Sequence, residues 1–364
     1  MILPNMIYDH GLTLPDIADF PDAGKVTYPS NKVDWLPYDG EFNVAMREHN
    51  IEKFQVAYTK LCGDIFGSGE VELSGEARAT HQEQSSRIMQ FTGLYFNSCK
   101  NQVDRDDIPD NKISNDLDKY GCSHFKIDPG KIQAIKMMLS EQIDRLLSIQ
   151  DHEAKPHFYD RFVTMRKADR PDVFNAVEKI FDDNNVFTGA SKYNRNSKNL
   201  ALDTIALHIA TPTDTHHYQT LKDLPTVSDT ISLHMDPKFN LIKSILYLQD
   251  VDEDSGPFTT VPTSNRWYYD PFERMVACGN STGNYLDNQH KRDALLCMPS
   301  KMRKNVILGR YIRNGTQQSK MLLSKMHKYT SDHADCIIFD PTQTLHRGGL
   351  CNKGHRINLQ ILMR

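Results

Sequence analysis

The chain has 364 residues, of which 39% are hydrophobic and 25% are charged, and its formal net charge is −4 at pH 7. This length can bury a large core, and it suits either two average domains or one elaborated domain. Acidic and basic residues are interspersed without a long basic run, so nucleic acid is not expected as a partner.

The cysteines and the N-terminal residues bear on where the protein works. The seven cysteines are scattered and never spaced as Cys-x-x-Cys, which argues against a disulfide framework and against a structural zinc site. Residues 1–6 show no basic region followed by an apolar run, and no window approaches the roughly 20 apolar residues that cross a bilayer. We therefore expect a soluble, cytoplasmic protein without membrane association.

The first third of the chain is predicted to be partly helical. Residues 1–40 are rich in Pro, Asp and Gly without a clear period, which predicts irregular structure. Apolar residues at helical spacing predict one helix around residues 51–61 and a second over residues 74–97, after which a charged linker follows. We therefore predict an N-terminal, partly helical extension over residues 1–115 and a second domain over residues 116–364.

The second domain is predicted to begin with a strand and two helices. Residues 120–127 have the pattern of a short strand, and Pro129 is placed to open a helix of about five turns. A shorter helical pattern begins at Pro171 and ends at an Asp-Asp-Asn-Asn run. We expect both helices to pack on the outside of a sheet.

Strand-like segments dominate from residue 200 onward. They span residues 200–209, 230–234, 244–248, 258–261, 336–339 and 356–362. Short strands separated by turn residues predict a sandwich or a barrel, so the predicted fold class is mainly β with packed helices (α+β). A long insert with helical patterns, about residues 267–335, is expected to form a lid or binding segment, or to buttress the sheets.

A histidine and an aspartate two residues apart are the first candidates for chemistry. On an extended strand the side chains at i and i+2 point the same way, so His234 and Asp236 can reach one atom together. With His346 as a third ligand, they would form the facial triad of non-haem Fe(II) oxygenases, which leaves the opposite positions open. A His-x-Asp pair also occurs by chance on surfaces. Three other histidines are chemically able to bind a metal: His327, His333 and His355.

An arginine downstream of His346 is the next candidate. Arg356 follows His346 by ten residues and opens a segment whose alternation predicts a strand. Residues 352–354, Asn-Lys-Gly, are a turn signal, so a hairpin would place Arg356 beside the metal. There a guanidinium could hold a carboxylate with two hydrogen bonds, although a lone strand arginine is more often a salt-bridged or edge residue.

These residues and spacings resemble the Fe(II)/2-oxoglutarate-dependent dioxygenases, and within them the phytanoyl-CoA dioxygenase-like (PhyH) family. The resemblance covers roughly residues 118–364, and it includes a strand, an acidic turn and a Gly-Pro at residues 245–257. It implies a double-stranded β-helix, the jelly-roll or cupin-like core of that superfamily. The family pattern of an apolar strand before the distal histidine and Arg-Gly-Gly after it favours His346 over the other histidines.

The resemblance also implies roles for the site residues. The triad would bind Fe(II), and Arg356 would bind the distal carboxylate of the co-substrate 2-oxoglutarate. Related halogenases have a small residue in place of Asp236, so a carboxylate there indicates hydroxylation or another oxidative outcome. A polar side chain upstream often steadies the metal-bound end of 2-oxoglutarate, and the candidates are Gln219 and Lys222, unless that stretch is an ordinary polar loop.

Four further residues are candidates for the substrate pocket. They lie on or near strands that would line the cavity: Tyr247, Thr260, Ser264 and Trp267. Aromatic residues of this kind also form cores. Thr263 and Asn265 depart from the Gly and His of the family pattern, and the acidic run over residues 250–254 is interpreted as a solvated turn, not as a second metal site.

Together these features predict an Fe(II)- and 2-oxoglutarate-dependent dioxygenase, an oxidoreductase that consumes dioxygen and releases succinate and CO2. The favoured reaction is hydroxylation of a small soluble metabolite, with an acyl thioester kept open as substrate. One alternative is an oxygenase of the same class that catalyses desaturation, cyclisation or cleavage. Another is a non-catalytic metal-binding jelly-roll scaffold. No oligomeric state is predicted.

Overall fold

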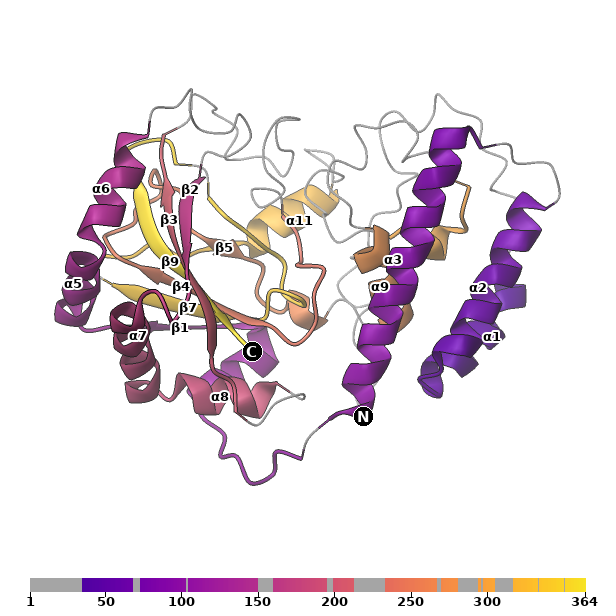
Figure 1. Ribbon diagram of the computed structural model, residues 1–364, viewed down its shortest axis with the longest axis horizontal. Coiled ribbons are helices and arrows are strands. Elements are labelled where there is room, and N and C mark those ends of the chain that lie inside the picture. Colours follow the sequence, from indigo (N-terminus) through magenta and orange to yellow (C-terminus); the bar gives the residue numbers. More distant parts are fainter. Residues whose placement is uncertain are drawn as a thin grey trace. The chain divides into compact units, whose positions relative to one another are not determined.

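The computed structural model describes residues 35–67, 73–102, 104–149, 160–194, 199–212, 233–266, 270–280, 294–295, 297–304, 317–332, 334–349 and 351–364. Contacts divide the chain into two compact units (Figure 1). The helical unit contains the chain up to Asn101 together with Asp236–Phe239 and Arg266–Ile312, and the sheet unit contains Gln102–Met235, Asn240–Asn265 and Arg313–Arg364. The predicted boundary at residue 115 stays a prediction.

The helical unit is built on amphipathic helices whose aromatic side chains form its core. Its elements are α1 (Leu36–Arg47), α2 (Ile51–Phe66), α3 (Gly75–Lys100), α9 (Pro271–Asn280) and the 3-10 turn η8 (Ser300–Met302). The Asn50 and Ser74 side chains cap α2 and α3 by accepting hydrogen bonds from backbone N–H groups of the first turn. Phe42, Phe54 and Phe272 pack together, with ring centroids 4.9–5.9 Å apart.

A six-stranded antiparallel sheet forms the body of the sheet unit. Its strands are ordered β1-β7-β4-β9-β3-β2. They comprise β1 (Cys122–Lys126), β2 (Asp160–Met165), β3 (Leu202–Ala210), β4 (Ile242–Tyr247), β7 (Asp335–Phe339) and β9 (Arg356–Met363). A second, three-stranded antiparallel sheet has the order β6-β5-β8 and comprises β6 (His327–Lys328), β5 (Thr259–Thr260) and β8 (His346–Arg347).

Helices cover one face of the larger sheet (Figure 1). The helices of this unit are α4 (Lys112–Tyr120), α5 (Pro129–Met138), α6 (Ser140–Ser148), α7 (Pro171–Asp183), α8 (Val186–Tyr193) and α11 (Gln317–Lys325). Apolar residues of α5, α6, α7 and α8 pack against every second residue of the strands, for example Leu246, Ile338 and Leu359. Strand side chains alternate between faces, so the intervening residues must point the other way.

The opposite face of the larger sheet meets the segment that carries the smaller sheet. Ile245, Tyr247 and Phe339 of the larger sheet form a separate core with Phe258 and Tyr329. The Tyr247 hydroxyl donates to the Tyr329 carbonyl oxygen at 3.0 Å and accepts from the Phe258 N–H at 2.9 Å. This buried phenol therefore fixes the two chain segments that flank β5 and β6 against the larger sheet.

The predicted combination of antiparallel strands and packed helices is confirmed, with corrections of detail. Helices contribute more of the described residues than strands do, so α+β fits better than mainly β. The single helix expected after Pro129 is divided at Leu139, where ψ is 4°, into α5 and α6. The irregular structure expected up to residue 40 gives way to α1 from Leu36. Within the described ranges every helix is too short or too polar to cross a bilayer.

Candidate metal centre

Three predicted ligands come together in the structure. His234, Asp236 and His346 each offer one ligand atom, and these atoms all lie within 4.8 Å of one another. Both histidines are buried, whereas Asp236 is partly exposed. In the part of the chain that the structure describes, no other group of three or more His, Cys, Asp or Glu side chains has this spacing.

The two histidines are held together by their own backbones. His234 N–H donates to the His346 carbonyl oxygen at 3.0 Å, and His346 N–H donates to the His234 carbonyl oxygen at 2.9 Å. This isolated antiparallel bridge takes the place of the strand expected to end at His234, whose residues 230–232 lie outside the described ranges. It brings the two imidazole centroids to 4.4 Å, and Asp236 follows two residues later.

A hydrogen bond fixes the ring of His346. Its Nδ1 lies 2.9 Å from the carbonyl oxygen of Thr344. Because a carbonyl oxygen only accepts, Nδ1 must carry the proton, and the lone pair for a metal is then on Nε2. The ring also packs on Phe339 and Phe258, at centroid distances of 4.9 and 6.0 Å. Such support of a ligand histidine by a backbone carbonyl is common around protein-bound metals.

Gly121 in turn holds Thr344. The Thr344 hydroxyl donates to the Gly121 carbonyl oxygen at 2.9 Å, and the Thr344 N–H donates to the Asp340 carbonyl oxygen at 2.9 Å. Gly121 ends α4 in the left-handed conformation, with φ at 76°. A Cβ atom at this position would collide with the Thr344 hydroxyl. The orientation of His346 therefore depends on a glycine more than 200 residues earlier in the chain.

We expect Gly121→Ala to destabilise the fold and to weaken metal binding. A left-handed residue with a Cβ costs about 1–2 kcal/mol, and the forced shift of Thr344 adds about 1–3 kcal/mol. Gly354→Ala is the matched control, because Gly354 has φ 72° but open space around its Cα. Urea unfolding in chelator and Mn(II) titration measure the two effects. Equal behaviour of the two variants would contradict the role given to Thr344.

Three candidate pocket residues are fully buried and are engaged in internal contacts. Thr260 is paired with His346 across β5 and β8, and its hydroxyl lies 3.2 Å from the Tyr329 hydroxyl. The Ser264 hydroxyl accepts from the Leu345 N–H at 2.8 Å. Tyr247 is bonded to backbone groups on both sides, as described above. These contacts position the segment around His346, and a substrate-binding role for the three residues stays a prediction.

Residues that sequence reasoning missed surround Thr260. The Cys122 thiol lies 3.0 Å from the Tyr329 hydroxyl and 3.6 Å from the Thr260 hydroxyl. Burial is the main cause that raises the pKa of both Cys122 and Tyr329 above their ordinary values, so both groups remain protonated at neutral pH. The strand predicted over residues 120–127 includes Cys122, but no sequence signal pairs this cysteine with Tyr329.

Arg356 is buried at the start of β9, with 5% of its surface exposed. Its Nε donates to the Asn358 side-chain oxygen at 3.3 Å, and its Nη1 donates to the carbonyl oxygens of Gly349, at 3.2 Å, and Gly256. Asn358 lies opposite Tyr247 in the β4–β9 register, on the face away from the helices. Arg356 alternates with Ile357 and so shares that face, which also carries Phe339 under the His346 ring.

The remaining predicted residues are placed as follows. His327 is exposed on β6, and the backbone carbonyl of His355 accepts from the Gln249 side chain at 2.6 Å. Neither joins the triad. Four residues named from the sequence lie outside the described ranges: Gln219, Lys222, Trp267 and His333.

The acidic turn after β4 is organised by Asp252. Its carboxylate accepts from the Ser255 hydroxyl at 2.6 Å and from the Ser255 N–H at 2.8 Å. These hydrogen bonds hold the pKa of Asp252 below its ordinary value. Glu253 pairs with Lys328 at 2.6 Å, and residues 252–254 are exposed. The solvated turn expected from the sequence agrees with this arrangement.

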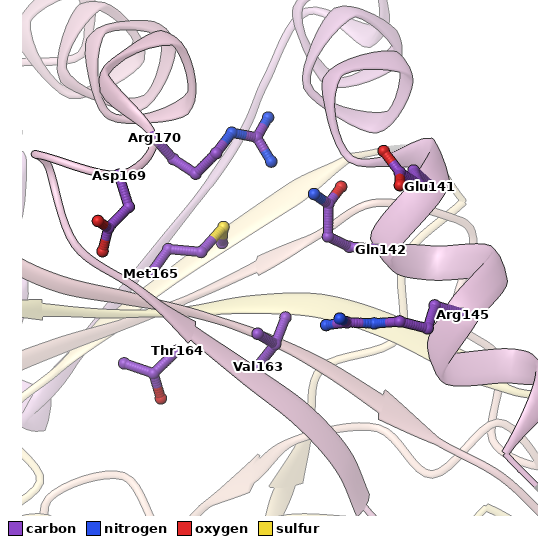
Figure 2. A pocket seen from close by; sticks show the side chains of 8 residues that line it. All are labelled: Glu141, Gln142, Arg145, Val163, Thr164, Met165, Asp169 and Arg170. Carbon is purple, nitrogen blue, oxygen red and sulfur yellow. The ribbon is translucent and has the colours of Figure 1, made fainter.

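A separate hollow of about 220 Å³ opens between α6 and β2 (Figure 2). It is lined by Glu141, Gln142, Arg145, Val163, Thr164, Met165, Asp169 and Arg170. Val163 and Met165 belong to the helix-covered face of the sheet, whereas Tyr247 and Phe339 belong to the other face. No triad residue lines this hollow, so it contributes nothing to the candidate metal centre.

Two imidazoles and one carboxylate within this spacing form the ligand set of the facial-triad class of metal centres. No protein-family model matches the sequence, and no curated protein matches it. Among solved structures, the chain is similar to the "non-heme alpha ketoglutarate dependent carbocyclase SnoK from nogalamycin biosynthesis", at 9% identity and a TM-score of 0.41, over 71% of this chain and 84% of that one.

Two further solved structures are similar to the same degree. The epimerase SnoN, in complex with Fe3+, alpha ketoglutarate and nogalamycin RO, has 13% identity and a TM-score of 0.38, over 69% of this chain and 82% of that one. EctD from S. alaskensis with bound Fe has 8% identity and a TM-score of 0.40, over 72% and 79% of the two chains.

Proposed function

We propose that the protein is a non-haem Fe(II)- and 2-oxoglutarate-dependent oxygenase whose metal ligands are His234, Asp236 and His346. The observation that carries the proposal is the meeting of these three side chains within 4.8 Å, from positions up to 112 residues apart in the chain. Two neutral imidazoles and one carboxylate on one side of an ion are the ligand set of this enzyme class.

The surroundings of the triad fit a metal ion. The Thr344 carbonyl directs the proton of His346 to Nδ1 and so leaves Nε2 as the ligand atom. Both histidines are buried, whereas Asp236 is partly exposed. Bound there, Fe(II) would supply the activation of dioxygen that oxidises a substrate C–H bond.

Arg356 is the proposed anchor for the distal carboxylate of 2-oxoglutarate. Its guanidinium is buried and always charged, and it shares a sheet face with Phe339, on which the His346 ring packs. The contacts of Nε and Nη1 with Asn358, Gly256 and Gly349 fix the plane of the guanidinium. Gln219 and Lys222 are proposed to contact the metal-bound end of the co-substrate.

The fold supports the same proposal. Two antiparallel sheets face each other across the core formed by Ile245, Tyr247, Phe258, Tyr329 and Phe339. We interpret them as the larger and smaller sheets of a double-stranded β-helix, with His346 on the smaller one. The proposed reaction is hydroxylation of a small soluble metabolite, with Thr260 and Trp267 as proposed substrate contacts. The alternative reactions, which are desaturation, cyclisation and cleavage, would use the same metal ligands.

The direct test is release of succinate from 2-oxoglutarate by the purified protein with Fe(II) and ascorbate in air. We expect slow turnover without substrate, its loss on adding a chelator, and acceleration by a metabolite fraction that contains the substrate. A stable protein that binds Mn(II) but releases no succinate, and gains no thermal stability from 2-oxoglutarate, would indicate a non-catalytic metal-binding scaffold.

A further inference from the structure

One metal-ligand candidate belongs to the helical unit by its contacts. The four-residue segment Asp236–Phe239 clusters with α3 and α9, although the chain before and after it belongs to the sheet unit. Phe239 makes the contacts: its ring centroid lies 6.0 Å from that of Phe91 and 6.2 Å from that of Tyr95, both on α3. The Arg274 guanidinium of α9 lies over the same ring, 5.5 Å from its centroid.

The chain between His234 and β4 is short, so the position of Phe239 limits that of Asp236. His234 is fixed at one end by its paired hydrogen bonds with His346. Within the segment, Lys238 N–H donates to the Asp236 carbonyl oxygen at 2.8 Å. Directly after it, Asn240 adopts a left-handed conformation, with φ at 58°, before β4 begins at Ile242. The backbone of Asp236 therefore lies between two residues whose positions are fixed by their contacts, His234 and Phe239.

The charge of Asp236 also acts on a residue of α9. Burial raises the pKa of the Cys278 thiol on α9 to about 11, and the Asp236 carboxylate is near enough to raise it further, while Arg274 opposes the shift. Arg274 therefore lies close to the Phe239 ring and also acts on the Cys278 thiol, whose pKa Asp236 raises.

We propose that Phe239 is a positioning residue of the metal centre: packed between Phe91, Tyr95 and Arg274, it fixes the loop that presents the Asp236 carboxylate. This inference rests on the proposed metal site. It assigns the side chains of α3 and α9 that contact Phe239 a part in holding the Asp236 loop.

The test compares the Mn(II) affinity of the full chain with that of Phe239→Ala, by titration with the metal alone. Loss of such indirect support typically weakens a metal site by about 10- to 100-fold, and we expect a loss of this size. Phe239→Tyr keeps the ring and should restore wild-type affinity. Phe239→Leu keeps apolar bulk without a ring and should bind with intermediate affinity, which provides a second variant if the alanine protein is poorly folded.

Phe66→Ala is the matched control. Phe66 is a half-buried aromatic residue of the same unit, and its ring contacts His81 at 4.7 Å, whereas the Phe239 ring contacts Phe91 and Tyr95. We expect it to lower thermal stability without changing Mn(II) affinity. An unchanged affinity of Phe239→Ala, or an equal loss in both alanine variants, would overturn the positioning role. Failure of the unsubstituted protein to bind Mn(II) would instead overturn the proposed metal centre itself.

Discussion

Replacing His346 by alanine is expected to abolish 2-oxoglutarate turnover and to weaken Mn(II) binding by about 100- to 1000-fold, the order of one ligand's share in a protein metal site. The ring is 4% exposed and packs on Phe339 and Phe258, so its removal also leaves a cavity. We expect a loss of roughly 2–3 kcal/mol in the free energy of unfolding from that cavity. Metal titration, succinate release and urea unfolding separate the two effects.

His327→Ala is the control for this prediction. His327 and His346 both lie opposite Thr260, on the two strands that pair with β5. His327 is exposed and outside the triad, so its loss should leave metal affinity and turnover unchanged. If His327→Ala removed metal binding and His346→Ala did not, the triad would have the wrong third member.

Replacing Arg356 by alanine is expected to raise the 2-oxoglutarate concentration for half-maximal turnover by about 100-fold or more. Each hydrogen bond to a charged group contributes about 1.5–3 kcal/mol, so loss of a two-bond grip on a carboxylate produces an effect of this size. Metal affinity measured without co-substrate should change little. The measurement is succinate release as a function of 2-oxoglutarate concentration at saturating Fe(II).

Arg161→Ala controls for the structural part of the Arg356 substitution. Arg161 is a buried arginine of β2 whose Nη1 donates to the carbonyl oxygens of Leu146 and Leu147, each at 3.1 Å. Like Arg356, it satisfies two carbonyl groups, but it lies at the edge strand beside α6. Its loss should destabilise the protein without altering the 2-oxoglutarate requirement. Equal kinetic effects of the two substitutions would show that Arg356 acts only through stability.

Local patterns predicted the elements that have strong periodicity. Helical spacing predicted α2, α3 and α7, although α2 and α3 end five and three residues beyond their predicted ends. Strand-like composition predicted β3, β4, β7 and β9 within one or two residues. Weak patterns failed where tertiary contacts decide: α1 has only three buried residues, and β6 and β8 are two residues long. No local rule joins residues 236–239 and 271–280 to helices near the N-terminus, because such contacts depend on the folded chain.

The metal ligands could be predicted from the sequence because residue type and spacing identify them, whereas the residues that support them could not. His-x-Asp and the distal His346 can be recognised because a metal requires those donors, and the structure brings them together. Thr344 supports His346 through its backbone carbonyl, which any residue type possesses, and its hydroxyl bonds to Gly121 far away in the chain, so no local sequence signal reveals either role. In the sequence, Phe239 is an ordinary apolar residue of a loop, and its contacts with α3 and α9 become evident only in the folded structure.

The backbone pair between His234 and His346 has a consequence for how the ion arrives. These hydrogen bonds close a loop of 112 residues, so the entropy of that closure is lost when the chain folds and not when a metal binds. The two histidines should therefore be in place before a metal ion binds. We expect metal ions to bind and dissociate without unfolding of the chain, at rates governed by the loss of water from the hydrated ion.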